Sequence, residues 1–373
     1  MITVEQVTTK RQQKEFIEFP LKLYKDNKCY IPPLYSDEKK IFRKDYVYND
    51  MCDSIFFNAY KDGKMAGRIS GIIQRAANKK NNEKRVRFCR FDVIEDEQVA
   101  RELFAKVEQW AKDNGMDTVV GPLSYSDLER EGMLVGGYEY PATFEETYNY
   151  PYYGSFMEKM GYKKEVDWTG SRLRLPKDYN GELEQMADYV MRRYNLHLAT
   201  ARSTKEYLAK YADGFFELLD KSYDQIYGSV PFTDAMKKLM LDNFSLILSK
   251  DNLVIVLDEN EKMICLGLAF PSIGEALRPS GGRLTPGAIF RVLRAIKHPK
   301  VLDLGLVGVD PEWLNRGISV VISAAMVKML KMPGVLYAET NMNLEDNYAI
   351  QNQWKRFDEQ KIKLHRSYVK SLG

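Results

Sequence analysis

The chain has 373 residues, of which 45% are hydrophobic and 29% are charged. This length allows two domains of ordinary size, and the composition is that of a globular protein with apolar cores, not of a disordered or fibrous chain. The formal net charge of +3 is too small to indicate a nucleic-acid-binding protein.

The four cysteines form no CxxC pair, and the three histidines lie far apart in the sequence. We therefore expect reduced thiols and no metal site. The N-terminus has no basic leader followed by an apolar stretch, and no apolar run approaches the roughly 20 residues of a membrane span. These features predict a cytoplasmic protein without a membrane partner.

The first half of the chain is expected to alternate strands and helices. The Asp62-Gly63 pair between two alternating apolar segments predicts a hairpin with a tight turn. In helix 97–112 the apolar residues recur at helical spacing, and Gly115 ends the pattern. The predicted elements are strand 2–7, helix 12–26, hairpin 54–74, strand 85–93, helix 97–112, strand 118–120, helix 152–160 and strand 168–175.

The second half repeats this order of elements after a boundary near residues 176–180. A short echo, Lys64-Met65-Ala66-Gly67 against residues 262–267, supports a duplication. The sequence thus predicts an α/β protein with a mixed sheet and two copies of one topology. The predicted elements are strand 196–201, helices 205–223 and 233–248, hairpin 253–270, helix 288–297, strand 301–309, helix 317–330, strand 335–340, helix 347–357 and strand 363–370.

The junction between strand 301–309 and the following helix is the most informative segment. The strand ends in a turn, and Gly317 stands where the helix begins. Such a junction presents unpaired backbone N–H groups and the positive end of the helix dipole. It therefore predicts an anion site, although an ordinary strand–turn–helix connection also explains a glycine at this position.

The second half resembles the GNAT acyl-CoA N-acyltransferases. Their pyrophosphate loop, Gln/Arg-x-x-Gly-x-Gly/Ala, falls on residues 314–319, with Leu314 at the usually polar first position. Further motifs resemble a group of large bacterial tandem GNAT-like proteins: Gly121-Pro122, residues 132–138, residues 149–153 and residues 227–231. The resemblance implies two GNAT-like domains, 1–177 and 178–373.

The resemblance also implies a donor, acetyl-CoA or another acyl-CoA, and an amine acceptor on a small molecule or a peptide. Arg316 could add positive charge beside the phosphates. The implied donor-binding residues are Val307, Val309, Leu314, Asn315, Arg316, Gly317, Ile318, Ser319 and Asn347.

Acyl transfer to an amine needs a base, because an alkyl ammonium with a pKa near 10.4 must lose a proton before it attacks. Glu339 is the candidate base, with Asp310 behind it, and a backbone N–H near Val309 is the candidate oxyanion donor. Family members usually protonate the thiolate with a tyrosine seven residues after an asparagine. Counting from Asn347 gives Trp354, which cannot transfer that proton, so Tyr348 is the alternative. A surface carboxylate or an internal salt bridge explains Glu339 equally well.

The first copy lacks a glycine at the corresponding loop, and four carboxylates lie within residues 91–99. They would cap the helix and repel a phosphate, so we expect the N-terminal domain not to bind CoA. An aromatic segment, residues 138–153, is expected to pack as a lid or an interface, or to wall a shared cleft.

Residues 274–300 form an insertion that has no acidic residue after Glu275. Two interpretations are open: the insertion has a function, or it is a basic face exposed to solvent. Three hypotheses follow for the whole chain. The first is an acyl-CoA-dependent N-acyltransferase working from the C-terminal domain, and the second is a catalytically degenerate ligand-binding protein. The third, suggested by the basic tract alone, is a Fem-like aminoacyl or peptidyl transferase, although a nucleic-acid partner is otherwise not indicated.

Overall fold

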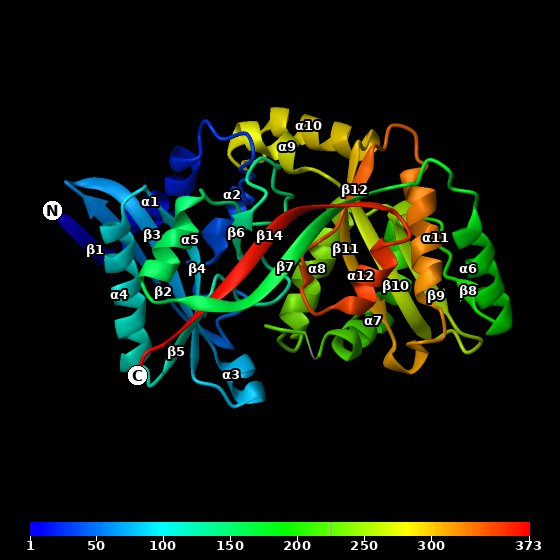
Figure 1. The fold of residues 1–373 in the computed structure, drawn as a ribbon, viewed down its shortest axis with the longest axis horizontal. Coiled ribbons are helices and arrows are strands. Elements are labelled where there is room, and N and C mark those ends of the chain that lie inside the picture. The colour runs from blue at the N-terminus through cyan, green and yellow to red at the C-terminus, as the bar shows by residue number, and fades with distance from the viewer. Residues whose placement is uncertain (225) are drawn as a thin grey trace. The chain divides into compact units, whose positions relative to one another are not determined.

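The computed structural model describes residues 1–224 and 226–373, without the side chains of residues 244–246. Contacts divide the chain into two compact units. Unit 1 contains residues 1–169, 274–292 and 362–373, and unit 2 contains residues 170–273 and 293–361. Both units combine helices with a mixed sheet, which confirms the predicted fold class (Figure 1).

The two units are not the same as the predicted segments 1–177 and 178–373. Residues 274–292 of the insertion belong to unit 1. The last strand of each half is also exchanged: β14 (Asp358–Ser371) ends in unit 1, and β7 (Lys163–Arg174) ends in unit 2. The repeat of elements predicted from the sequence is present, but each copy of the sheet is completed by a strand from the other half.

The sheet of unit 1 has the order β1-β2-β3-β4-β5-β14-β7, and β6 pairs with β14. The predicted hairpin is present, with Asp62 and Gly63 both at positive φ in the turn. β5 runs parallel to β4 and antiparallel to β14, with Gly121 opposite Tyr368. The remaining strands are β1 (Ile2–Gln6), β2 (Cys52–Lys61), β3 (Lys64–Gln74), β4 (Arg85–Val93), β5 (Thr118–Gly121) and β6 (Met133–Gly136).

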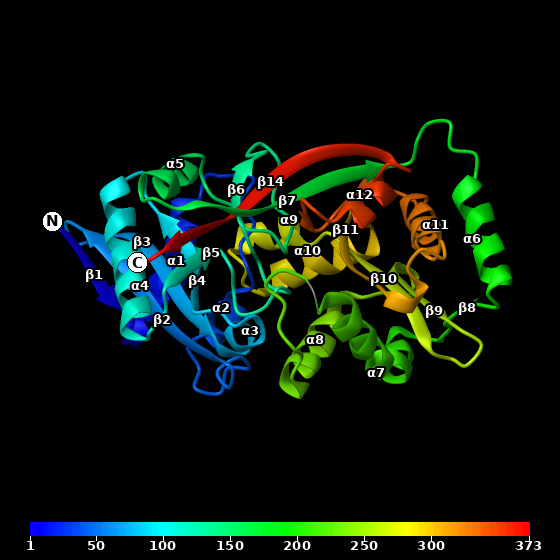
Figure 2. The same cartoon turned by 60° about the horizontal axis from the view of Figure 1, so that its bottom comes forward.

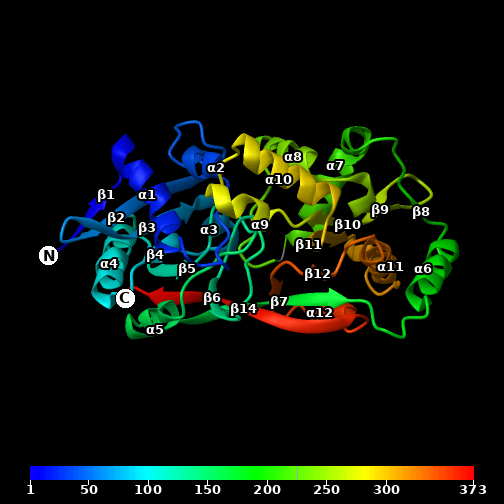
Figure 3. The same ribbon diagram turned by 90° about the horizontal axis from the view of Figure 1, so that it is seen from above.

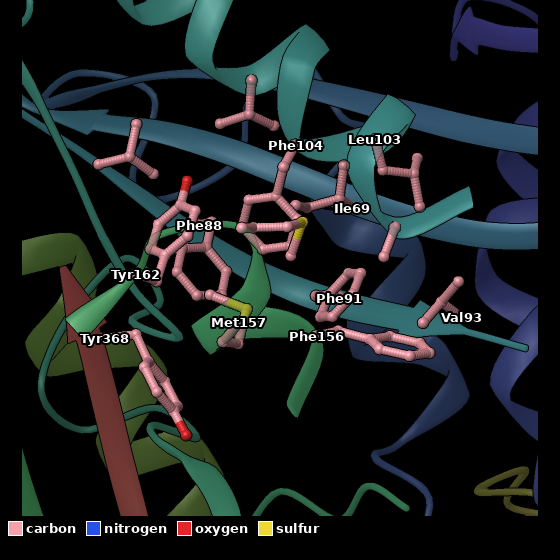
Figure 4. Close-up of a cluster of buried hydrophobic side chains, with 14 of the residues drawn as sticks. Ile69, Phe88, Phe91, Val93, Leu103, Phe104, Phe156, Met157, Tyr162 and Tyr368 are labelled. Carbon is pink, nitrogen blue, oxygen red and sulfur yellow. The ribbon is translucent and has the colours of Figure 1, made fainter. Parts of the chain in front are cut away.

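One face of this sheet is covered by α4 (Glu97–Asp113), whose apolar residues follow the predicted helical spacing. They pack with β-strand residues and with α5 (Tyr152–Lys159) into an aromatic-rich core that includes Phe88, Phe104 and Tyr162 (Figure 4). Unit 1 also contains α1 (Lys10–Leu23), α2 (Tyr35–Lys40), α3 (Arg75–Asn81), α9 (Gly274–Leu277) and the first part of α10 (Pro286–Lys297).

The first part of the insertion is held by residues 18–35 of unit 1. It contains α9 and a 3-10 turn, Arg278–Ser280. The N–H of Tyr35 donates to the carbonyl of Gly282, and the Arg283 guanidinium lies 2.9 Å from the Glu18 carboxylate. These contacts fix the start of α10 (Pro286–Lys297).

The sheet of unit 2 has the order β7-β12-β11-β10-β9-β8. β12 runs parallel to β11 and antiparallel to the end of β7, with Glu339 opposite Arg172. The predicted strand 196–201 is reduced to two residues. The strands are β8 (His197–Leu198), β9 (Leu253–Leu257), β10 (Met263–Pro271), β11 (Val301–Val309) and β12 (Tyr337–Glu339), with β13 (Asn343–Leu344) pairing with β7 outside this order.

Helices cover both faces of this sheet (Figure 2). α7 (Thr204–Tyr223) contacts β10, β11 and α8 (Asp234–Ile247), while α11 (Ser319–Leu330) packs with α6 (Glu182–Arg193). α6 was not among the predicted elements, although its N-terminus has two acidic residues and its C-terminus two arginines, as helices prefer. α12 (Tyr348–Trp354) is shorter than its predicted range, and 3-10 turns lie at Lys250–Asn252 and Pro311–Trp313.

The short sequence echo has a structural counterpart. A Cβ atom added to Gly67 on β3 would lie 2.8 Å from the Leu103 side chain of α4, and one added to Gly267 on β10 would lie 3.1 Å from Ile322 of α11. In both copies, a glycine in the second strand of the hairpin allows the covering helix to pack closely against the sheet. This similarity supports the predicted duplication.

His365 lies in the interior of unit 1 and provides a test of this packing by pH. Its Nε2 is 3.2 Å from the carbonyl of Thr147, and burial lowers its pKa to about 4, against the opposing effect of Glu146. The folded protein therefore keeps His365 neutral at a pH where the unfolded chain, with a pKa near 6.5, binds a proton.

We expect the free energy of unfolding to fall as the pH drops from about 6.5 toward 4, with about 3 kcal/mol due to His365. Urea unfolding at a series of pH values measures this loss. His365→Gln should flatten the profile in this range, and His298→Gln, which changes an exposed histidine, is the comparison. Equal slopes in all three proteins would show that His365 is not the group responsible.

Candidate functional site

Most of the residues predicted to form a site in the second half lie on β11 or in the turn that follows it. β12 pairs with β11 only at three positions, Val301 with Tyr337, Leu302 with Ala338 and Asp303 with Glu339. Beyond Asp303 the two strands part, so residues 304–309 have no strand partner on this side among the described residues. This part of β11 offers an open row of backbone groups.

The backbone groups of Val307 and Val309 point to this open edge. The N–H of Asp310 donates to the carbonyl of Ile264 on β10, and backbone groups along a strand alternate between its two sides. Val307 and Val309 therefore face away from β10. Their carbonyls accept hydrogen bonds from two side chains at the end of α7, Tyr223 (3.1 Å) and Ser222 (3.0 Å).

The turn after β11 has the backbone geometry of an anion-binding nest. Asn315 and Gly317 adopt left-handed conformations, with φ of 66° and 77°. A Cβ added to Gly317 would meet only Val190 of α6, at 3.4 Å, so glycine is required here by backbone conformation and not by lack of space. Residues 314–317 are exposed, and Ile318 is buried beneath them.

The amides at the start of α11 are not used by the protein itself. Within the described ranges, the N–H groups of Asn315, Gly317, Ile318 and Ser319 have no hydrogen-bond acceptor, and no side chain caps the helix. An α-helix leaves its first N–H groups unsatisfied, and they carry the positive end of the dipole. This exposed group of donors can bind an anion.

The equivalent helix of the first half, α4, is capped by its own carboxylate. Asp96 accepts hydrogen bonds from the N–H groups of Gln98 (3.0 Å) and Val99 (3.4 Å). Its ion pair with Lys61, together with these amides, lowers the pKa of Asp96. A phosphate would have to displace this carboxylate to bind at the start of α4.

The side chains of the turn are anchored around Trp313. The Arg316 guanidinium lies 4.7 Å from the centre of the Trp313 ring, which in turn contacts Tyr194 after α6 edge-on. Leu314 is exposed and makes no polar contribution. Arg316 thus brings a positive charge to the same turn as the free amides, and a guanidinium is a strong partner for a phosphate.

Glu339 is buried where β11 and β12 part. Its carboxylate accepts a hydrogen bond from Arg172 Nε at 2.7 Å, and that guanidinium stacks on the Tyr337 ring at 4.5 Å. Glu339 is thus held in an internal salt bridge, the alternative raised from the sequence. Glu339 is paired with Asp303, six residues before Val309 on β11. At about 3.3 Å per residue, Glu339 therefore lies about 20 Å from Val309, at the opposite end of the open edge.

The other predicted residues have identifiable structural roles. Asp310 is buried, accepts from the N–H of Glu312 at 3.1 Å and lies 3.3 Å from Lys262 Nζ. Asn347 caps α12 by accepting from Ile350 N at 3.2 Å, and Tyr348 beside it is exposed.

Trp354, at the position of the family's usual tyrosine, is buried and donates from its indole to Asn343 at 2.7 Å. The indole therefore has a packing role in this unit.

Three contributors were missed from the sequence. Ser222 and Tyr223 lie at the end of a predicted helix, and no local pattern indicates that they contact β11. Arg172 was assigned to the first half, because the exchange of β7 into unit 2 has no local signal in the sequence.

Two curated proteins match almost the full chain, whereas no protein-family model matches it. Protein YghO of Escherichia coli is 26% identical over 376 residues, which cover 97% of this chain and 94% of YghO. The bacterial ceramide synthase of Caulobacter vibrioides is 23% identical over 383 residues, which cover 100% of this chain and 98% of that protein.

The solved structures decide the fold. A tandem GNAT protein from the clavulanic acid biosynthesis pathway aligns over 100% of this chain and 99% of its own, with a TM-score of 0.57 at 11% identity. This chain has a tandem GNAT-like fold. A GCN5-related N-acetyltransferase from Sphaerobacter thermophilus also aligns over 100% of this chain and 96% of its own, with a TM-score of 0.50 at 11% identity.

Throughout the described residues, no helix is long and apolar enough to cross a membrane.

Proposed function

We propose that this chain is an acyl-CoA-dependent N-acyltransferase whose donor site lies in unit 2. The observation that carries the proposal is the uncapped start of α11, with four free amides beside Gly317 and Arg316. The diphosphate of CoA matches this group of donors in charge and in hydrogen-bonding capacity. The capped start of α4 is an internal comparison that lacks all of these features.

The open edge of β11 suits the remainder of the donor. The pantetheine arm of CoA carries two amide groups, and amides pair with the backbone of an unpaired strand as another strand would. Val307 and Val309 present their N–H and carbonyl groups there, and the carbonyls now accept from Tyr223 and Ser222. Binding of the arm along this edge would require these hydroxyls to change partners.

The chemistry transfers an acyl group from sulfur to nitrogen. Glu339 takes a proton from the acceptor ammonium, and the free amine attacks the thioester carbonyl, so that a C–N bond forms as the C–S bond breaks. The oxyanion donor must lie within hydrogen-bond reach of the same carbonyl. The N–H near Val309 that the sequence suggested lies about 20 Å from Glu339, so this step requires a backbone N–H of β11 closer to Asp303. The products are an amide and the CoA thiol, once the leaving thiolate has gained a proton.

Two hydroxyl groups are candidates for delivering that proton. Tyr348 remains the candidate taken from the sequence, but it lies exposed at the start of α12. Tyr223 contacts the open edge directly, through the carbonyl of Val307. A thiolate also leaves without assistance, because thiol pKa values lie near 8.5, so either tyrosine is expected to contribute modestly.

The acceptor proposed here is a long-chain amino alcohol. The likeness to the ceramide synthase extends over the whole of both chains, and a ceramide is the amide of a fatty acid with such an amine. A fatty acyl-CoA is then the expected donor in place of acetyl-CoA. Release of CoA thiol with palmitoyl-CoA and sphinganine, set against acetyl-CoA and small amines, tests this choice.

Replacing Glu339 with glutamine is expected to lower the turnover number by roughly 10²–10⁴-fold, because the base is lost while the shape of the site is kept. CoA binding measured by calorimetry should stay within about twofold, since Glu339 lies far along β11 from the free amides. Glu182→Gln, an exposed change on α6, is the control. Unchanged turnover in Glu339→Gln would remove Glu339 as the base.

The second hypothesis, a ligand-binding protein without turnover, is favoured by Trp354 and by the salt bridge of Glu339 with Arg172. It predicts CoA binding with no thiol release for any donor and amine. The two hypotheses share the α11 site and differ only in the reaction.

A further inference from the structure

The outward side of α10 carries an unusual concentration of exposed apolar residues. Eleven large hydrophobic side chains are exposed among the described residues, and four of them lie within ten positions of one another. Phe290 and Leu293 are the most prominent, with 67% and 60% of their surface exposed. The other two are Leu284 and Ile289.

Three of these residues, Ile289, Phe290 and Leu293, lie on α10, and Leu284 lies just before it. Figure 3 shows the course of this helix. Ile289 and Leu293 are one turn apart, and Phe290 lies three residues before Leu293, so the three side chains share a side of α10. Ala288 is buried on the opposite side, and the Arg291 guanidinium donates to the carbonyl of Ala276 at 2.9 Å. The helix is therefore fixed by its inner side, and the apolar side remains exposed.

The charges along this segment have one sign. No acidic residue occurs between Glu275 and Asp303. Arg278, Arg283 and Arg291 are engaged by the protein itself. Arg294 and Lys297, exposed at the C-terminal end of α10, have no carboxylate partner in the part of the chain that the structure describes.

An exposed apolar stripe next to unpaired cations matches the boundary of an anionic bilayer. Apolar side chains enter the zone between headgroups and acyl chains, while lysine and arginine extend to the lipid phosphates. α10 has twelve residues and is about 18 Å long, which is too short to span the hydrocarbon core. Such a helix lies in the plane of the surface.

We infer that α10 docks this protein onto an anionic lipid surface, with Phe290 and Leu293 inserted and Arg294 and Lys297 on the headgroups. Nucleic acid is a poorer match, because the centre of the surface is apolar and the cations lie to one end. This docking concerns α10 alone and does not depend on CoA binding or acyl transfer.

Sedimentation of the full chain with vesicles tests the inference, without donor or acceptor. Binding is expected with vesicles that contain one third phosphatidylglycerol, and to be at least about tenfold weaker with phosphatidylcholine alone. Phe290→Ser/Leu293→Ser and Arg294→Gln/Lys297→Gln should each reduce the partition coefficient by about tenfold or more. All four side chains are exposed, so folding should be retained, as circular dichroism can check.

Matched controls change similar residues elsewhere. Met186→Ser/Leu336→Ser replaces side chains that are 49% and 63% exposed, and Lys106→Gln/Lys112→Gln removes two exposed cations of α4. Both controls should bind vesicles like the original protein. Equal binding by the α10 variants, or no vesicle binding at all, would overturn the inference. So would a dimer in light scattering that Phe290→Ser/Leu293→Ser dissociates, because a second copy would then cover α10.

Discussion

Replacing Gly317 with aspartate is expected to weaken CoA binding by at least about 100-fold in calorimetry. The change places a carboxylate beside the free amides of Ile318 and Ser319, where it can occupy donors otherwise available to phosphate. Hydrogen bonds to a charged group contribute about 1.5–3 kcal/mol each, so the loss of two is sufficient for this effect. One CoA per chain is expected for the original protein, because Asp96 already caps α4.

Gly334→Asp is a closely matched control. Gly334 is also exposed and left-handed, with φ of 90°, and an added Cβ would meet only the carbonyl of Pro299, at 3.6 Å. The backbone strain of the two variants should therefore be similar, whereas only Gly317 lies at the start of α11. Equal CoA affinity in both variants, or no binding by the original protein, would contradict the proposed donor site.

Replacing Glu146 with glutamine is expected to lower the free energy of unfolding by about 3 kcal/mol or more. Glu146 and Lys363 form an ion pair inside unit 1, with both side chains almost fully buried. Burial alone would raise the pKa of Glu146, but Lys363 keeps it low. Glutamine can still accept the hydrogen bond from the N–H of Thr143. The main cost is that the buried charge of Lys363 is left without a partner.

Urea unfolding at pH 7.5 measures this effect. Adding Lys363→Met to Glu146→Gln should recover at least half of the loss, because the uncompensated charge is then removed. Asp37→Asn, which changes a half-exposed pair with Lys40, should cost less than about 1 kcal/mol. A cost for Glu146→Gln no larger than that of Asp37→Asn would show that the buried pair is not important for stability.

Features encoded over short stretches of sequence could be predicted. The hairpin at Asp62-Gly63, the apolar face of α4 and the strand–turn–helix junction at Gly317 each depend on neighbouring residues, and each is present. The carboxylates before α4 likewise predicted a capped helix start, and Asp96 provides the cap. Backbone requirements of this kind can be recognised in a short stretch of sequence, because each restricts the residue type at one position.

The partners of the candidate catalytic residues could not be predicted. Arg172 and Glu339 are 167 positions apart, and the register of two strands from different halves brings them together. The contact of Tyr223 with β11 depends on how α7 crosses the sheet. The exposure of Phe290 is likewise a tertiary property, and the basic tract by itself had suggested only a solvated face or a charged partner.

The exchange of β7 and β14 has a consequence for any attempt to divide the molecule. A fragment ending near Pro176 would lack β14, leaving the edge of β5 open to aggregation. The complementary fragment would lack β7, and with it the arginine that accompanies Glu339. Neither half is therefore suited to independent expression, and a split version of the gene should yield folded protein only when both pieces are produced together.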